Sequence, residues 1–433
     1  MDRQHLARIA VVSLVSSVGF AGSARATGFA VREGNTDWMA NAFAGETAKA
    51  YDAATAYANP AGMVRLSHSE IEQSINLISP SARFSGENSF GPGLTTPGTS
   101  GGNAAQFAAI PTLYGVWSYR PDLKFGLSVD TPFGLRAAYP SDWVGRYQSL
   151  VSGVTNINVS LSAAYAINEH LSIGGGPVVD YFHGRLTQAI NTGPTAAITG
   201  DPTADVHGAD VGFGFNLGAM YQFNDSLRLG VDYRSRIQHN LDATQSIFVP
   251  GQLSALNPAV AGALQALGGT VTTKITLPDN IAADLYWQIN PAWAVMGGVQ
   301  WTHWSLFKSV TIVPQNGGPL EQTPENWRNT WLLGVGVNWQ VLPKLLLQTG
   351  FSWDQSPITK STRTTRIPDA DRYTLGVGAQ YQLLPATTLQ VAYAHGFVAA
   401  APIRNSASST AGVIDGSYEI HANTLSLGLK MRF

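Results

Sequence analysis

The sequence predicts an all-β protein: a transmembrane antiparallel barrel of about fourteen strands with an N-terminal plug in its lumen. Three observations predict this fold class. Apolar and polar residues alternate with a period of two residues, as in strands with one apolar and one polar face. Tight turns alternate with long polar loops. The chain ends in an amphipathic strand whose last residue is Phe433.

The composition separates the chain from ordinary soluble proteins. Only 12% of its 433 residues are charged, and it contains 45 Gly and 11 Trp, whereas about a quarter of a typical soluble chain is charged. No run of about 18 apolar residues follows the N-terminus, which excludes spanning helices. Cys is absent, so disulfides and thiolate chemistry are excluded, and the formal net charge of −2 argues against a nucleic-acid partner.

Residues 1–26 have the parts of a cleaved secretory signal peptide. Arg3 and Arg8 give a positive start, residues 9–20 form an apolar core too short to span a membrane, and Ala-Arg-Ala at 24–26 is a small-residue cleavage site. We therefore expect an exported mature chain that begins at Thr27.

The segment 27–66 is rich in Ala and Gly and ends near Asn59-Pro60-Ala61-Gly62. Wall side chains fill the lumen of a barrel of about eight strands, whereas a larger barrel leaves room for water. We expect 27–66 to occupy this space as a plug, and 67–433 to form the barrel. A disordered periplasmic tail is the alternative.

The alternation is clear along residues 227–234, where Leu227, Leu229, Val231 and Tyr233 are apolar and the intervening residues are polar or Gly. A β-sandwich would show the same pattern. The predicted strands are 68–79, 106–120, 123–133, 154–167, 170–184, 209–223, 227–240, 271–289, 292–310, 326–341, 344–357, 370–383, 387–399 and 418–433.

Turns and aromatic residues favour the barrel over the sandwich. Short turn signals such as Pro121-Asp122 and Asn224-Asp225 recur after every second strand, with longer loops between them. An aromatic residue stands two or three positions before each turn, as expected for a girdle at one membrane interface. These aromatic residues are Tyr119, Tyr165, Tyr221, Trp287, Trp339 and Tyr381.

The last strand carries an unbroken apolar stripe that ends at Phe433. It resembles the terminal strand that the assembly machinery of outer-membrane barrels reads. We expect that machinery as a partner, and a monomer in the outer membrane of a Gram-negative bacterium, surrounded by membrane lipid and lipopolysaccharide.

The chain resembles the FadL/TodX family of outer-membrane transporters for long-chain fatty acids and aromatic hydrocarbons, over essentially the whole mature protein. The resemblance rests on motifs in a fixed order. They are Gly28-Phe29, Asn59-Pro60-Ala61-Gly62, Thr131-Pro132-Phe133-Gly134-Leu135, Asp142-Trp143-Val144-Gly145-Arg146-Tyr147, Asp232-Tyr233-Arg234-Ser235 with Ile237 and His239, Trp301-Thr302-His303-Trp304-Ser305 with Phe307, and Ile367-Pro368-Asp369-Ala370-Asp371-Arg372-Tyr373.

The resemblance implies a barrel of fourteen strands whose N-terminal segment is a movable hatch. Phe29 would reach into a lumenal binding pocket. The turn Asn59-Pro60-Ala61-Gly62 would gate the path, and because proline fixes φ and lacks an N–H, we expect few hydrogen bonds between this turn and the wall. A turn that only leads into the first strand is the alternative.

Pro132, Phe133 and Gly134 end the predicted third strand. Proline removes a ladder donor and glycine permits a bend. In the family, a kink in this strand opens a gap in the side of the barrel through which a hydrophobic solute leaves, so the resemblance implies the same here. A strand that simply ends after crossing the bilayer is the alternative.

The loop 241–270 contains apolar residues at helical spacing, with no charge between Phe248 and Thr273. They are Leu256, Val260, Leu264 and Leu267. The family's loop helices form a greasy groove where solute is captured, and a lid over the pore is the alternative.

Charged residues with lumenal parity are expected to pair mostly with one another. They are Lys124, Asp180, Arg228, Asp232, Arg234, Arg236, Asp284 and Asp354. A second interpretation is that Arg234 or Arg236 holds a substrate carboxylate.

An enzyme is not expected, because no Gly-x-Ser-x-Gly occurs and the His residues, including His68, His183, His303 and His421, lack metal-binding spacing. The sequence therefore predicts a passive channel for a fatty acid or an aromatic hydrocarbon, without cofactor or energy coupling. A general porin for small polar solutes is the alternative, although it would need neither the plug nor an apolar loop helix.

Overall fold

The computed structural model describes residues 28–315, 317, 321–406 and 410–433, so the predicted signal peptide and Thr27 lie outside the described residues. The strands, grouped into spans across the wall, are β1 (Glu70–Ser89), β2 (Ala108–Arg120), β3 (Leu123–Asp130) with β4 (Gly134–Ala138), β5 (Val151–Ala166), β6 (Leu171–Ala189), β7 (Thr203–Asn224), β8 (Leu227–Arg234) with β9 (Ile237–Phe248), β10 (Gly269–Leu277) with β11 (Asn280–Gln288), β12 (Trp293–Thr302) with β13 (Ser309–Pro314), β14 (Glu321–Pro324) with β15 (Thr330–Leu342), β16 (Leu345–Asp354), β17 (Arg372–Leu384), β18 (Thr387–Val398) with β19 (Ala401–Asn405), and β20 (Val413–Arg432).

Within the described residues these strands form one closed antiparallel barrel of fourteen spans. β1 closes it by pairing with β2 on one edge and with β20 on the other, from Glu70 opposite Arg432 to Ser89 opposite Val413. The predicted fold class is therefore confirmed. Closure matters in a membrane because an open edge would leave backbone N–H and C=O groups unpaired in hydrocarbon.

Short helices lie before β1 and in the loops: α2 (Thr36–Ala40), α3 (Glu46–Lys49), α4 (Thr55–Ala58) and the 3-10 helix η2 (Pro60–Arg65) before β1; η3 (Gly193–Thr195) and α5 (Ala196–Thr199) between β6 and β7; α6 (Gly251–Leu256) and α7 (Pro258–Gln265) between β9 and β10; and η4 (Trp304–Leu306) between β12 and β13. None of the helices in the described ranges is long and apolar enough to cross a membrane.

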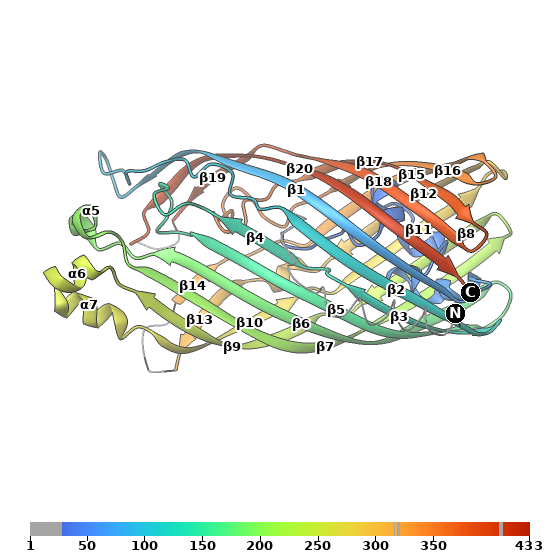
Figure 1. Cartoon of the computed structure of the whole chain (residues 1–433), viewed down its shortest axis with the longest axis horizontal. Helices are drawn as coiled ribbons and strands as arrows, with labels where there is room; N and C mark the ends of the chain where they lie inside the picture. Colours follow the sequence, from blue (N-terminus) through green and yellow to red (C-terminus); the bar gives the residue numbers. More distant parts are fainter. Residues whose placement is uncertain (1–27, 316, 318–320, 407–409) are drawn as a thin grey trace, which may run out of the picture.

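The two ends of the barrel differ (Figure 1). One end carries tight turns and the C-terminus, and the other carries the long loops with α5, α6 and α7. All six aromatic residues predicted for the girdle are 41–55% exposed and precede the tight turns. By the usual asymmetry of outer-membrane barrels, the tight turns face the periplasm and the loops face the cell exterior.

The observed strands differ from the predicted ones in two ways. β1, β7 and β20 extend further toward the cell exterior than predicted. Their outer parts pair beyond the apolar belt, where side chains do not face lipid and apolar and polar residues need not alternate. Three predicted continuous strands are interrupted: 227–240 between β8 and β9, 271–289 between β10 and β11, and 292–310 between β12 and β13. Only Pro278, which lacks a ladder donor, marks one of these breaks in the sequence.

The hatch, defined here as residues 28–66, lies inside the barrel, nearer the periplasmic end (Figure 1). Most of its residues are buried. Wall glycines make this packing possible, because a Cβ at Gly230, Gly350 or Gly376 would clash with the hatch backbone. The alternative of a disordered tail is therefore excluded for residues 28–66.

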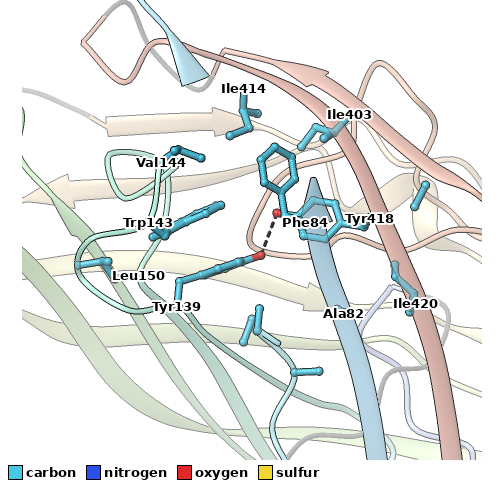
Figure 2. Packing of buried hydrophobic residues seen from close by; sticks show 14 of the residues in the cluster. Ala82, Phe84, Tyr139, Trp143, Val144, Leu150, Ile403, Ile414, Tyr418 and Ile420 are labelled. Atoms are coloured by element: carbon cyan, nitrogen blue, oxygen red, sulfur yellow. Dashed lines mark hydrogen bonds between the residues drawn. The ribbon is translucent and has the colours of Figure 1, made fainter. Parts of the chain in front are cut away.

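A cap covers part of the extracellular mouth. The segment between β4 and β5 folds inward, and Tyr139 stacks on Trp143 with ring centroids 3.8 Å apart. The hydroxyl of Tyr139 also lies 2.9 Å from that of Tyr418 on β20 (Figure 2). Phe84 of β1 packs against the same cluster, which joins the cap to the strands that close the barrel (Figure 2).

Candidate transport pathway

Charged wall residues hold the hatch in place. Asp284 accepts hydrogen bonds from the backbone N of Gly45 and of Thr47, both at 2.9 Å, and from Thr47 Oγ1 at 2.8 Å. Arg228 donates to the backbone oxygens of Ala48 and Lys49. Charge-assisted bonds of this kind are about twice as strong as neutral ones.

A third contact joins the hatch to the wall, since Arg32 Nε lies 3.0 Å from Asp354 Oδ2. The expectation that lumenal charges pair with one another is therefore wrong for Arg228, Asp284 and Asp354. Each binds the hatch instead, because the plug brings its own backbone groups and Arg32 into the lumen. Asp232 and Arg234 do pair within the wall, at 3.5 Å.

The hatch also has a buried internal ion pair. Lys49 Nζ lies 2.5 Å from Asp37 Oδ2, and both side chains are 2% exposed. The wall supports this pair, because Gln348 and Gln380 each donate to Asp37 Oδ1, at 2.6 and 2.8 Å. A buried pair with its remaining lone pairs satisfied is costly to break from either side, so the hatch is fixed against the wall here.

The turn Asn59-Pro60-Ala61-Gly62 is fully buried and begins η2. Asn59 Nδ2 donates to Ala219 O of the wall at 3.0 Å, and Ser172 Oγ donates to Ala61 O at 2.9 Å. A Cβ at Gly218 would clash with the Asn59 side chain. The turn is thus held by wall hydrogen bonds and close packing, which corrects the expectation of a loosely bound turn.

The wall is interrupted at Thr131-Pro132-Phe133. β3 pairs with β2 no further than Val129 opposite Leu113, and β4 pairs only with β5. In the described part of the chain, residues 108–112 of β2 therefore have no ladder partner on the side that faces β4. Just before this segment, a single bridge joins Ala105 to Ala137 of β4.

The start of the hatch covers this interruption from inside. Val31 N donates to Pro132 O, and Gly134 N donates to Phe29 O, both at 2.8 Å. On the β2 side, Thr112 Oγ1 donates to Gly34 O at 2.6 Å. The hatch thus supplies the hydrogen bonds that a wall strand would otherwise make, so the interruption and the hatch are one bonded unit.

Phe29 lies at the edge of an apolar pocket above the hatch. Its ring packs on Trp304 at 5.0 Å, Phe307 at 5.6 Å, and Phe133 and Trp327 at 5.7 Å between centroids. The pocket contains about 1190 Å³ of space between protein atoms, part of it open to solvent. Its largely apolar lining suits an apolar ligand.

Four ionisable side chains also line this pocket: Arg185, His207, Glu325 and Arg366. Burial raises the pKa of Glu325 to about 8, against the opposing effects of a hydrogen bond from Trp327 Nε1 and the charge of Arg366, so this carboxyl is mostly protonated at neutral pH. Arg366 donates to Gln188 Oε1 at 2.6 Å. The pocket is therefore apolar with a charged edge.

A second, more polar chamber lies directly over the hatch, with Trp38 and Glu46 in its lining. Burial and the nearby Asp284 raise the pKa of Glu46 to about 8. Arg234 lines this chamber and stacks on Tyr57, with its guanidinium carbon 3.5 Å from the ring centre.

Arg236 does not have the lumenal position expected from its parity. Its side chain is 54% exposed and lies 3.5 Å from Asp279. The break at 235–236 between β8 and β9 reverses the alternation, so that Ile237 and His239, rather than Arg236, are buried.

The apolar loop residues lie on two short helices and the turn after them rather than on one helix. Asn257 separates these helices and caps α7, because its side chain accepts a hydrogen bond from Val260 N. Leu256 is 67% and Val260 38% exposed, whereas Leu264 and Leu267 are partly buried. The loop thus presents apolar side chains to the exterior.

The structure brings together residues that sequence reasoning did not single out as site residues. Trp304 and Phe307 come from η4 and its end, Trp327 from the connection before β15, and Arg366 and Glu325 from two different loops. Trp304 and Phe307 belonged to a recognised motif. Trp327, Glu325 and Arg366 were not part of one, and they meet the others only when the barrel closes.

Comparison with known proteins decides the family. Residues 17–433 match the family described as outer membrane protein transport protein (OMPP1/FadL/TodX). The chain belongs to this family. A putative outer membrane protein of Neisseria meningitidis is 28% identical over 98% of each chain, and the long-chain fatty acid transport protein of Escherichia coli strain K12 is 24% identical over 84% of each.

Solved structures agree with the FadL/TodX assignment. A FadL homologue from Pseudomonas aeruginosa has a TM-score of 0.86 at 25% identity, covering 94% of this chain and 100% of that one. The toluene transporter TodX of P. putida has a TM-score of 0.63 at 14% identity, covering 87% and 92%, and shares the fold.

Membership of the FadL/TodX family places the protein in the Gram-negative outer membrane, among transporters of hydrophobic compounds rather than enzymes.

Proposed function

We propose that the protein carries a long-chain fatty acid or an aromatic hydrocarbon passively across the outer membrane and releases it sideways through the wall at β3–β4. The observation that supports this most directly is the bonding of hatch residues 29–31 to the interrupted wall, immediately beside an apolar pocket. Movement of the hatch would free the interrupted wall and open the pocket.

Capture occurs at the extracellular loops. Leu256, Val260, Leu264 and Leu267 form an apolar surface on α6, α7 and the turn after them, and exposed apolar surface in water favours association with apolar solutes. No charged residue lies between Phe248 and Thr273 to oppose this binding.

The solute then occupies the pocket around Phe29. Four aromatic rings from three separate segments surround this side chain, so the pocket offers edge and face contacts to both acyl chains and aromatic rings. For a carboxylate, Arg234 in the lower chamber is a candidate contact, whereas Arg236 could meet one only at the outer surface.

Release follows a shift of the hatch at Asn59-Pro60-Ala61-Gly62. Loss of the bonds from Ser172 and to Ala219 would free the turn, and withdrawal of residues 29–31 would uncover Pro132, Phe133 and Gly134. No cofactor or energy source takes part, because the solute moves down its gradient.

The same architecture bears on the partners of the protein in the membrane and on its oligomeric state. The strand that ends at Phe433, which is 71% exposed, would engage the outer-membrane assembly machinery, and lipid and lipopolysaccharide would cover the apolar belt. A closed sheet has no free edge for strand pairing between copies, which favours a monomer.

Bound-ligand identification tests this function. Mass spectrometry of the protein purified in mild detergent should reveal fatty acids or aromatic compounds, and cells that express the protein should take up labelled hexadecanoate or toluene above background. Bound sugars with no hydrophobic uptake would contradict the proposal and favour a general porin.

A further inference from the structure

A second interruption of the wall lies between β10 and β13. These strands pair only where Val271, Thr272 and Thr273 face Pro314, Val313 and Ile312. Below that, residues 274–277 and 308–311 face each other with no backbone hydrogen bond between them in the described ranges. His303 N, which donates to Asp279 O at 3.0 Å, closes the lower edge. We call this four-residue interruption the window.

The window is not covered by the hatch. β13 instead uses its other edge to pair with β14, from Ser309 opposite Pro324 to Ile312 opposite Glu321. Side chains alone therefore separate the lumen from the outer surface at this point, whereas the β3–β4 interruption is also closed by hatch backbone.

Cavities lie on both sides of the window. Outside is a groove with about 1210 Å³ of space between protein atoms, part of it open to solvent. Inside is the apolar pocket around Phe29. Leu241, Thr273 and Phe307 line both cavities, so these three side chains are the partition between them.

The outer edge of the window is basic. Lys274 and Lys308 are exposed, line the groove, and make no ion pair in the described part of the chain. Asp242 is the acidic residue in the groove lining, which leaves one net positive charge. Ammonium groups at such a position attract an anionic head group.

The inner side is apolar, with two polar atoms left unsatisfied. Thr273 Oγ1 and Gln245 Oε1 are buried without a hydrogen-bond partner, and both residues line the inner pocket. An unsatisfied buried polar atom is costly, and a ligand group can remove that cost.

The window also lies at the correct height for an amphiphile. On the span that contains β10 and β11, outward side chains are apolar up to Ile281, which is 45% exposed, and the next outward positions are Thr276 and Lys274. The window thus lies where the apolar belt gives way to the head-group region.

We propose that the window binds single-chain anionic amphiphiles, with the head group at Lys274 and Lys308 and the chain passing Thr273 into the pocket around Phe29. This inference rests on the proposed function, since it gives the same pocket a second approach from the side. It also selects the substrate class, because a neutral hydrocarbon gains nothing from the two ammonium groups.

The test compares hexadecanoate with hexadecanol, which share a chain and differ in charge. The full chain is purified in mild detergent as wild type, as Lys274→Glu/Lys308→Glu, and as the control Lys344→Glu/Lys360→Glu, which reverses two exposed lysines away from the window. We expect the window variant to bind hexadecanoate about tenfold more weakly, and hexadecanol and the control to change by less than about twofold.

A photoreactive hexadecanoate locates the chain. In the wild type it should label residues 273–277 and 306–311, and Thr273→Trp should abolish that labelling while the barrel still migrates as a heat-modifiable species. Equal hexadecanoate affinity in the window variant and the control, or labelling confined to other regions, would overturn the proposal.

Two further outcomes separate the hypotheses. If phosphatidylglycerol displaces hexadecanoate at equal or lower concentration, the ligand is a two-chain membrane lipid and the single-chain assignment is wrong. If the wild type binds neither hexadecanoate nor hexadecanol and cells that express it take up no toluene, the proposed function itself fails. Binding of both C16 compounds with no effect of the window variant, or uptake of toluene without binding of hexadecanoate, defeats only the window.

Discussion

The two interruptions of the wall differ in what closes them. At β3–β4 the hatch backbone completes the missing hydrogen bonds, through Val31 to Pro132 O and Gly134 to Phe29 O. At the window no hatch residue takes part, and Leu241, Thr273 and Phe307 form the partition. Backbone hydrogen bonds break only when a segment moves, whereas side chains rearrange locally and rapidly. The first site is therefore suited to gating and the second to binding.

The largest effect is expected from deletion of residues 59–61. Without this turn, which bonds to Ala219 and Ser172, the hatch cannot make the shift that withdraws residues 29–31, so release at β3–β4 should fail and uptake should fall to background. Uptake of labelled hexadecanoate by cells measures this, and heat-modifiable migration in gels checks the barrel. Deletion of residues 91–93 in an open loop is the control, and normal uptake by the first deletion would refute hatch gating.

A bulky residue at the β3–β4 interruption should act next most strongly. A Cβ at Gly134 would meet only Val31, at 3.2 Å, so Gly134→Trp fills the space between β4 and the hatch. Uptake should fall several-fold while hexadecanoate affinity at the window stays unchanged. Gly115→Trp is the matched control, because nothing lies within 4 Å of that position on β2. Equal uptake by both variants would argue against a side exit.

Loss of a hatch anchor should loosen the gate without blocking it. Asp284→Asn removes a charge that accepts three hydrogen bonds from Gly45 and Thr47. Hydrogen bonds to charged groups contribute about 1.5–3 kcal/mol each, so amide exchange at these two residues should accelerate about tenfold or more. Exchange measured by mass spectrometry tests this, with Asp225→Asn on an exposed turn as control; unchanged protection would show that Asp284 does not hold the hatch.

The smallest effect is a pH dependence confined to the hatch. Burial, with the nearby Asp37 and Glu70 outweighing Lys430 and Lys49, raises the pKa of Asp52 from 3.8 to about 6. Because the docked state binds the proton more tightly, docking is favoured at low pH and weakens as pH rises from about 4 to about 6.

Protease resistance of the hatch, measured at pH 4 and pH 7, reports this change. Asp52→Asn should reduce the dependence, leaving the part due to Glu46, and make the hatch more resistant at pH 7 than the wild type. A wild-type hatch that becomes more resistant as pH rises would contradict the assignment.

The fold was largely predictable from the sequence because lipid imposes a simple rule on the wall. Outward residues such as Leu229 and Val231 must be apolar, so alternation reports strands directly. The break between β8 and β9 escaped this rule, since Ser235 and Arg236 continue the alternation in the sequence while the backbone reverses it. Arg236 was misplaced for that reason.

The candidate site was less predictable, for a different physical reason. Phe29 could be assigned through its family motif, but its partners Trp304, Phe307 and Trp327 become neighbours only in the closed barrel. The bonding of Asp284 to the hatch was not predicted, because two of its hydrogen-bond donors are backbone N–H groups, and these cannot be recognised from residue type. The window exists because β10 and β13 pair over only three residues. No local sequence pattern marks the point where this pairing ends.

The closing ladder between β1 and β20 has a consequence for biogenesis. β1 begins a few residues after the hatch, and its pairing with β20 joins the first and the last of the described strands in chain order. The hatch contacts β8 and β11 on one side of the lumen and β16 and β17 on another, so it cannot be threaded into a finished barrel without displacing wall contacts. The hatch must therefore dock before or while the cylinder is sealed.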